Sequence, residues 1–279
     1  MTRARGAGPS HRPQESAAPG RPGPSGASGR PGPDPSDVPG RPDPDSSGVP
    51  DPAAAAPADD RPEVEVSTRG LPAWLLPVAE AAARILPEQL SRFLPPAAGG
   101  RQSAVLILFG EGEDGPDLLL LERSAALRSH AGQPSFPGGA LDPADGDPEG
   151  QGPLRAALRE AEEETGLDPS GVRVFGVLPR LYIPVSGFVV TPVLGWWRTP
   201  SPVGVVDPAE TARVFRVPVT DLTDPANRAT LVHPSGFRGP AFLVNDALVW
   251  GFTAGLIDRL LHHGGWEIPW DRERTVPLG

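Results

Sequence analysis

The chain has 279 residues, with 39 prolines, 34 glycines and no cysteine. This length suits one large or two small domains, and the excess of proline and glycine indicates a low-complexity portion. The formal net charge of −10 argues against a general nucleic-acid binder, which needs a basic face. The lack of cysteine excludes disulfides, thiolate catalysis and Cys-ligated zinc, and it agrees with a cytoplasmic protein.

The first part of the chain, residues 1–62, repeats snippets such as GRPGP and GRPDP and has almost no large apolar residue. Such a segment buries too little surface to offset its ordering entropy, so we expect a disordered tail. Residues 63–279 are expected to form one domain with a helical lead-in at 71–95. No apolar segment follows the basic N-terminus, and runs such as 104–109 are too short to span a bilayer, so we expect no signal peptide and no membrane contact.

The elements predicted after residue 70 follow from apolar patterns and from residues that start or end helices and strands. A proline start and an Ala-rich interior predict a helix over 77–86, and Pro87 ends or kinks it before a second short helix at 88–94. Strands at 103–110 and 118–123 with the acidic segment 111–117 between them predict a hairpin with a long turn. Asn245-Asp246 suits a tight turn. The remaining predictions are helices at 154–165 and 252–263 and strands at 172–178, 188–197, 213–219, 241–244 and 247–250.

Helix 154–165 concentrates carboxylates on one side. On a helical wheel, Glu160, Glu163 and Glu164 share a sector, and Glu160 and Glu164 are four residues apart. Like charges at this spacing destabilise a helix unless a cation sits over them, and Mg²⁺ and Mn²⁺ prefer oxygen ligands. The alternative is a solvated acidic face with Arg155 and Arg159 as partners. The expected buried face consists of Leu154, Ala157, Leu158, Ala161 and Thr165.

A glycine turn upstream of this helix, Pro137-Gly138-Gly139, lets the backbone approach a ligand closely. Together with the run R-E-A-E-E-E-T-G-L over 159–167, it resembles the Nudix box, G-x5-E-x7-R-E-U-x-E-E-x-G-U, in which U is a bulky apolar residue. The resemblance implies an α+β fold, an α/β/α sandwich around a mixed β-sheet. It also implies metal-dependent hydrolysis of a nucleoside diphosphate linked to another moiety.

A longer series is similar to the coenzyme A pyrophosphatases of that superfamily, and the likeness spans roughly 101–263. It implies cleavage of coenzyme A or acyl-coenzyme A into 3′,5′-ADP and 4′-phosphopantetheine or its acyl form. The matching positions are Arg123-Ser124, Arg128, His130, Gly132-Gln133, 136–139, the aspartates Asp142, Asp145 and Asp147, and the segments 186–195 and 249–257.

One departure concerns loop 140–153. The gap from Gly139 to Arg159 is longer than the box spacing by six residues. Counting back from Arg159 places the first box glutamate at Gln151, with Glu149 close by. We therefore expect an altered geometry of this loop.

The resemblance also implies roles for single residues. Glu160 and Glu164, then Glu163, are the expected ligands of Mg²⁺ or Mn²⁺, and Arg159 orients them. The catalytic set is Glu163, Glu164 and Arg159, while the general base stays open among these glutamates or a loop carboxylate. Phosphate contacts are expected from Arg123, Arg128 and His130, with Gly138 and Gly139 close to the substrate; a Gly139 carbonyl ligand and a plain turn are both open.

Other interpretations stay open. The first alternative is a Nudix hydrolase for ADP-ribose, a dinucleotide or a nucleoside triphosphate. The second is a non-catalytic nucleotide-sensing module, and the third is a scaffolding role of the tail. We expect a small-molecule nucleotide partner and no nucleic acid, and a homodimer is left open. Phe136 is expected in the core, and His233, His262 and His263 at the surface or at helix ends.

Overall fold

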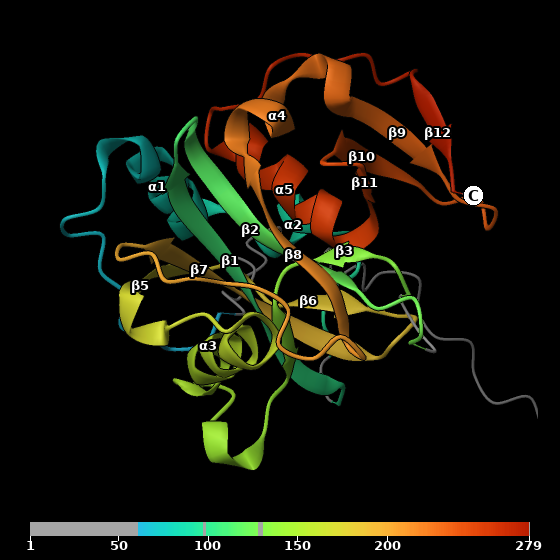
Figure 1. Ribbon diagram of the computed structural model, residues 1–279. Helices are drawn as coiled ribbons and strands as arrows, with labels where there is room; N and C mark the ends of the chain where they lie inside the picture. Colours follow the sequence, from blue (N-terminus) through green and yellow to red (C-terminus); the bar gives the residue numbers. More distant parts are fainter. Residues whose placement is uncertain (1–60, 97–98, 128–130, 279) are drawn as a thin grey trace, which may run out of the picture. The chain divides into compact units, whose positions relative to one another are not determined.

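The fold is described from a computed structural model for residues 61–96, 99–127 and 131–278 (Figure 1). Nearly all of the expected tail 1–62 therefore lies outside the described residues. All described residues belong to the unit Ala55–Gly279.

The main sheet mixes parallel and antiparallel pairs. Within the described residues it has eight strands in the order β3-β2-β1-β7-β5, with β4 on β1, β6 on β7 and β8 on β2. The pair β1–β7 is parallel, and the others are antiparallel. The strands are β1 (Arg101–Gly112), β2 (Gly115–Arg123), β3 (Pro134–Ser135), β4 (Gly138–Ala140), β5 (Val172–Val177), β6 (Leu181–Ile183), β7 (Phe188–Trp197) and β8 (Thr211–Pro218).

The expected hairpin forms, but the long turn at 111–117 is wrong. Pairing of β1 with β2 continues to Gly112 opposite Gly115, so only two residues connect the strands. Gly115 has φ 101°, a left-handed conformation that glycine adopts without steric cost. The acidic segment therefore mostly extends the two strands.

Helices cover both faces of this sheet. Alternate residues of β1 point to opposite sides: Leu106 and Leu108 pack with α3 (Gly152–Thr165), whereas Ile107 and Phe109 pack with α1 and α5. Figure 1 shows α3 below the sheet and α5 above it. This layering confirms the predicted α+β architecture. The other helices are α1 (Leu76–Arg84), α2 (Pro87–Leu90), α4 (Val219–Thr223) and α5 (Gly251–His263), with 3-10 turns at Ala73–Leu75, Pro143–Asp145, Pro169–Gly171 and Pro225–Asn227.

Helix α2 is shorter than the expected 88–94. Ser91 already has extended backbone angles, φ −151° and ψ 147°. The Phe93 carbonyl then accepts a hydrogen bond of 3.3 Å from the Tyr182 amide. The chain leaves the helix because this segment runs beside β6.

A second sheet lies in the C-terminal part, with the strand order β11-β10-β9-β12. Asn245 and Asp246 both have positive φ, 51° and 56°, which confirms the tight turn between β10 and β11. Strands β9 and β12 have no apolar pattern from which they were predicted. The bounds are β9 (Arg228–Val232), β10 (Arg238–Val244), β11 (Ala247–Val249) and β12 (Thr275–Pro277). Among the described residues, no helix combines the length and apolar character that a bilayer crossing requires.

Candidate active site

Helix α3 lies flat against the main sheet because its inner face is small and apolar. It begins with Pro153 in its first turn and ends at Gly166, which has φ 70° at the left-handed C-cap. The expected buried face is correct except that Leu158 is only partly buried and Ala156 is buried as well. Buried residues of the helix are Gly152, Pro153, Leu154, Ala156, Ala157, Ala161 and Thr165.

The glycines of β4 allow this helix and strand β1 to approach from opposite sides. A Cβ on Gly139 would stand 2.5 Å from both carboxylate oxygens of Glu160, and a Cβ on Gly138 would stand 2.7 Å from the Cα of Val105. The Gly138 amide donates a hydrogen bond of 2.9 Å to Oε2 of Glu164. Two carboxylates, one helical turn apart, thus converge on Gly138 and Gly139, which have no side chains to keep them away.

Burial makes the ionised forms of both carboxylates costly. Burial raises the pKa of Glu164 to about 7, against the lowering effects of the Gly138 amide and Arg123. The pKa of Glu160 is also raised, mainly by burial, although its hydrogen bond with Arg159 opposes this. A nearby cation would relieve this cost, because it favours the charged form.

Arg159 gathers the acidic groups around it. Its Nε and Nη2 donate to the two oxygens of Asp145 at 3.1 and 2.9 Å, a bidentate geometry. Its Nη1 donates to Glu160 at 2.8 Å and to Glu163 at 3.1 Å. The pKa of Asp145 is lowered, chiefly by this hydrogen bond. Asp145 therefore fixes the guanidinium of Arg159, and the remaining Nη1 of Arg159 contacts Glu160.

The pairing of Arg159 with Asp145 shows which residue of loop 140–153 takes the place of the first box glutamate. Asp145 is the sixth residue after Gly139, which is the box spacing when it is counted forward from the glycine. The extra residues therefore follow Asp145. Glu149 pairs with Arg180 at 2.6 Å instead, and Gln151 precedes α3 without a side-chain capping bond. Counting backward from Arg159 gave the wrong position because the insertion lies between the acid and the arginine.

Glu163 differs from its two neighbours. The Glu163 side chain is 58% exposed, against 18% for Glu160 and 10% for Glu164, and it pairs with Arg159. Two glutamates, not three, converge on β4. Within the part of the chain that the structure describes, no group of three or more Asp, Glu or His side chains is close enough to hold a metal ion.

Two further groups approach Glu164. Nη1 of Arg123, at the end of β2, lies 3.7 Å from Oε1 of Glu164. Glu210 lies just before β8; its carbonyl accepts a hydrogen bond of 2.8 Å from the Ser124 amide, and its charge raises the pKa of Glu164. No local motif marks Glu210, so its approach to the site could not be predicted from the sequence. The expected phosphate contacts Arg128 and His130 lie outside the described residues.

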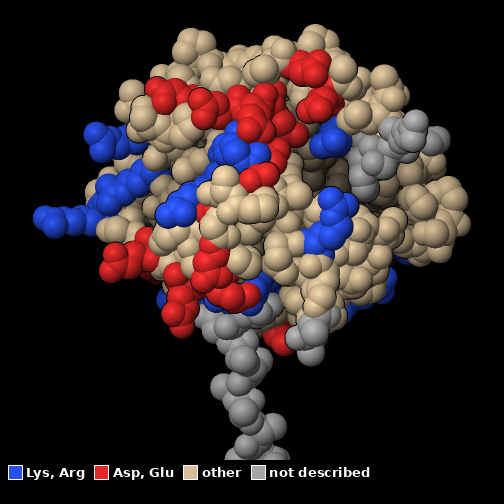
Figure 2. Space-filling model, turned by 90° about the horizontal axis from the view of Figure 1, so that it is seen from below, with Lys and Arg blue, Asp and Glu red and all other residues tan. Residues whose placement is uncertain are grey.

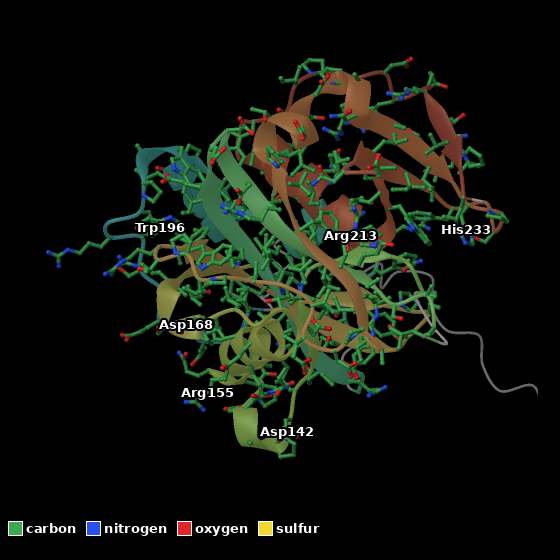
Figure 3. All side chains as sticks on the ribbon, in the orientation of Figure 1. Asp142, Arg155, Asp168, Trp196, Arg213 and His233 are labelled. Carbon is green, nitrogen blue, oxygen red and sulfur yellow. The ribbon has the colours of Figure 1, made fainter. Side chains whose placement is uncertain are left out.

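The face that carries α3 mixes both signs of charge. Figure 2, seen from below Figure 1, shows Asp and Glu side chains interspersed with arginines across this face. Figure 3, in the orientation of Figure 1, shows Asp142 and Arg155 near the bottom of the view, where the loop before α3 meets the helix. Arg155 donates to the Asp145 carbonyl at 3.1 Å, so the loop is tied to α3 at a second point.

Comparison with known proteins gives consistent results. A NUDIX domain profile matches residues 100–235. The uncharacterized Nudix hydrolase NudL of Citrobacter koseri is 39% identical over 203 residues, covering 65% of this chain and 95% of the relative. Its counterpart in Escherichia coli is 41% identical over 167 residues, covering 57% and 81%. The crystal structure of RenU, a Nudix hydrolase from M. smegmatis, is 21% identical, covers 59% of this chain and 86% of that one, and superposes with a TM-score of 0.39. The two NudL relatives, each about 40% identical and covered over more than four fifths of its length, show that the chain belongs to the Nudix hydrolase family.

Proposed function

We propose that this chain is a metal-dependent pyrophosphohydrolase that cleaves the diphosphate bond of coenzyme A or acyl-coenzyme A. The products would be 3′,5′-ADP and 4′-phosphopantetheine or its acyl form. The observation that carries the hydrolase part is the convergence of Glu160 and Glu164 on the glycines of β4. The preference for coenzyme A is supported by the sequence series from Arg123-Ser124 to Phe136.

The donor set fits a hard divalent cation. Glu160 uses Oε1 on Arg159 and Glu164 uses Oε2 on the Gly138 amide, so the candidate metal ligands are Oε2 of Glu160 and Oε1 of Glu164. The latter lies 3.7 Å from Nη1 of Arg123, beyond hydrogen-bond distance. Mg²⁺ and Mn²⁺ bind through one or two carboxylates together with waters and substrate phosphates. When bound, such an ion would neutralise the diphosphate and lower the pKa of a bound water. Glu163 would act through Arg159.

The chain's own side chains supply orientation and proton transfer. Arg159, fixed by Asp145, keeps Glu160 in place, and Arg123 at the edge of the site is suited to contact a phosphate. Attack by water forms a new P–O bond, the bridging P–O bond breaks, and the proton of water passes to a carboxylate. Glu164 and Glu210 are the two candidates for this base, because both lie at the site and burial brings the pKa of Glu164 near neutrality.

The decisive experiment is product analysis by mass after incubation with coenzyme A and Mg²⁺ in ¹⁸O-labelled water. We expect 3′,5′-ADP and 4′-phosphopantetheine, with the label in only one of them. Turnover of ADP-ribose, a dinucleotide or a nucleoside triphosphate without cleavage of coenzyme A would refute the substrate assignment. Binding without cleavage of any substrate would favour a nucleotide-sensing module.

We also propose that residues 63–279 carry the whole activity and that residues 1–62 are dispensable for it. The described site residues all come from the segment between Arg123 and Glu210, which supports this division.

A further inference from the structure

A polar cavity lies on the sheet face opposite α3. Its volume is about 340 Å³, and it opens between α2 and the last turns of α5. Both helices pack on the sheet face opposite α3, and both lie outside residues 100–235, which match the NUDIX profile. The cavity is therefore separate from the candidate active site. It is lined by Glu88, Gln89, Leu90, Ser91, Arg92, Arg259, His262 and His263.

The wall of this cavity offers mainly hydrogen-bond donors. Gln89 uses its Oε1 to accept from the Leu86 amide at 2.8 Å, so its NH₂ group remains for another partner. The Ser91 Oγ accepts from the Phe93 amide at 3.0 Å, so its hydroxyl proton can be donated. Four more lining side chains carry or can carry positive charge, and Glu88 is the one carboxylate among the lining residues. In a chain with a net charge of −10, this is an unusual concentration of donors.

Two of the cationic groups pair with acidic residues that do not line the cavity. Asp258 lies 3.7 Å from Arg259, and its other oxygen bonds to Arg228. Glu267 accepts from His262 at 2.6 Å. Neither acid lines the cavity. The cationic groups are thus oriented by acids that do not fill the space in front of them.

Positive charge is crowded at His263. Its ring lies edge-on to that of His262 with centroids 5.0 Å apart. Burial lowers the pKa of His263, and the neighbouring charges of His262 and Arg259 lower it further. An anion in the cavity would offset this repulsion.

We propose that this cavity binds a phosphate-class polyanion, with Arg92, Arg259 and His263 as its principal contacts. Guanidinium groups match the geometry of phosphate oxygens, and donors that approach from two helices suit a tetrahedral group better than a planar carboxylate. This inference goes beyond the proposed hydrolysis and does not depend on it.

The test uses inorganic pyrophosphate as the probe on the full chain, with EDTA present to remove metal ions. Imidazole ¹⁵N NMR follows the histidines while calorimetry measures the affinity. We expect the signals of His262 and His263 to shift, and the pKa of His263 to rise. Arg92→Gln and Arg259→Gln should each weaken binding about tenfold, the equivalent of one charged hydrogen bond. The control is Arg238→Gln, which removes an exposed arginine of β10 that does not line the cavity.

Three results would overturn the proposal. The first is the absence of any shift at His262 and His263 at millimolar pyrophosphate. The second is an equal loss of affinity in Arg238→Gln, which would indicate attraction to overall charge. The third is equally tight binding of citrate, which would assign the cavity to carboxylates. Pyrophosphate bound only at α3 would leave both histidine signals unchanged and would count as the first result.

Discussion

Two arginine–aspartate pairs in this chain show how the same chemistry serves different ends. Arg159 and Asp145 join α3 to the loop before it, and the Arg159 side chain is 30% exposed. Arg228 and Asp258 join β9 to α5, and Arg228 is fully buried. Its guanidinium lies between the rings of Phe242 and Trp270, 4.5 and 4.6 Å from their centroids.

The difference lies in how charge is balanced. Asp145, Glu160 and Glu163 share the single guanidinium of Arg159, so negative charge remains at α3. Around Arg228, Asp258 supplies the carboxylate, the other oxygen of Asp258 lies 3.7 Å from Arg259, and aromatic rings flank the buried guanidinium. Excess negative charge near the surface suits cation binding, whereas a buried carboxylate paired with guanidinium groups suits stability. Variants at the two pairs and around them test this contrast.

Glu164→Gln should abolish hydrolysis while it preserves the fold. The amide can still accept from the Gly138 amide, but it loses the negative charge expected to hold the metal ion. We expect kcat/KM to fall about a thousandfold, equivalent to about 4 kcal/mol. The matched control is Glu162→Gln on the exposed side of the same helix, which should stay within about twofold. An unchanged rate in Glu164→Gln would remove the metal-ligand assignment.

Asp258→Asn should reduce the stability of the fold and leave hydrolysis unchanged. It leaves the buried charge of Arg228 without its counter-ion, and we expect the free energy of unfolding to fall by about 3 to 4 kcal/mol. Denaturant unfolding measures this loss, and activity per folded molecule should not change. The double variant Arg228→Met with Asp258→Leu should recover much of the stability. Equal stability of Asp258→Asn and the parent chain would contradict the role given to this pair.

Stability should depend on pH through Glu164. Its pKa is 4.5 without the protein's influence and about 7 when folded, so the folded state binds the proton more tightly. The free energy of unfolding should therefore decrease as the pH rises from 4.5 through 7, by at most about 3 kcal/mol in the presence of a chelator. Unfolding curves across this range test it. Mg²⁺ should reduce the loss, and a slope that persists in Glu164→Gln would assign it to another group.

Asp145→Asn should weaken catalysis without abolishing it. Asp145 touches no reacting atom but fixes Arg159, and loss of such a supporting contact costs about 10- to 100-fold. We expect the effect in kcat rather than KM. Glu149→Gln is the matched comparison, because backward counting along the box ended at Gln151 and Glu149 is the nearest acidic residue to that position. A larger effect at Glu149 would show that the forward count from Gly139 is wrong.

Deletion of residues 1–62 should have the smallest effect. The segment contains neither arginine pair and no site residue. We expect kcat/KM for coenzyme A to stay within about twofold of the full chain. A large loss of activity in a deletion variant with the parent's thermal stability would show that the segment takes part in the reaction.

The features that can be read from the sequence are local. Helix α3 and most of its buried face follow from a 3.6-residue periodicity, and the β10–β11 turn follows from Asn245-Asp246. The R-E-A-E-E-E-T-G-L run and the glycines upstream were enough to identify the family resemblance that the relatives later confirmed. These signals are readable because each depends on residues only a few positions apart.

Only the tertiary structure decided which carboxylates meet. Glu160, Glu163 and Glu164 share one sector of the wheel, but β4 lies beside only part of it, so two turn inward and Glu163 stays exposed. The choice of Asp145 over Glu149 depends on where the loop bulges, and the approach of Glu210 depends on β8 pairing with β2. The strand pair β9–β12 joins segments more than 40 residues apart. Such contacts leave no periodic trace in the chain, because their energy comes from surfaces that exist only after the sheet has formed.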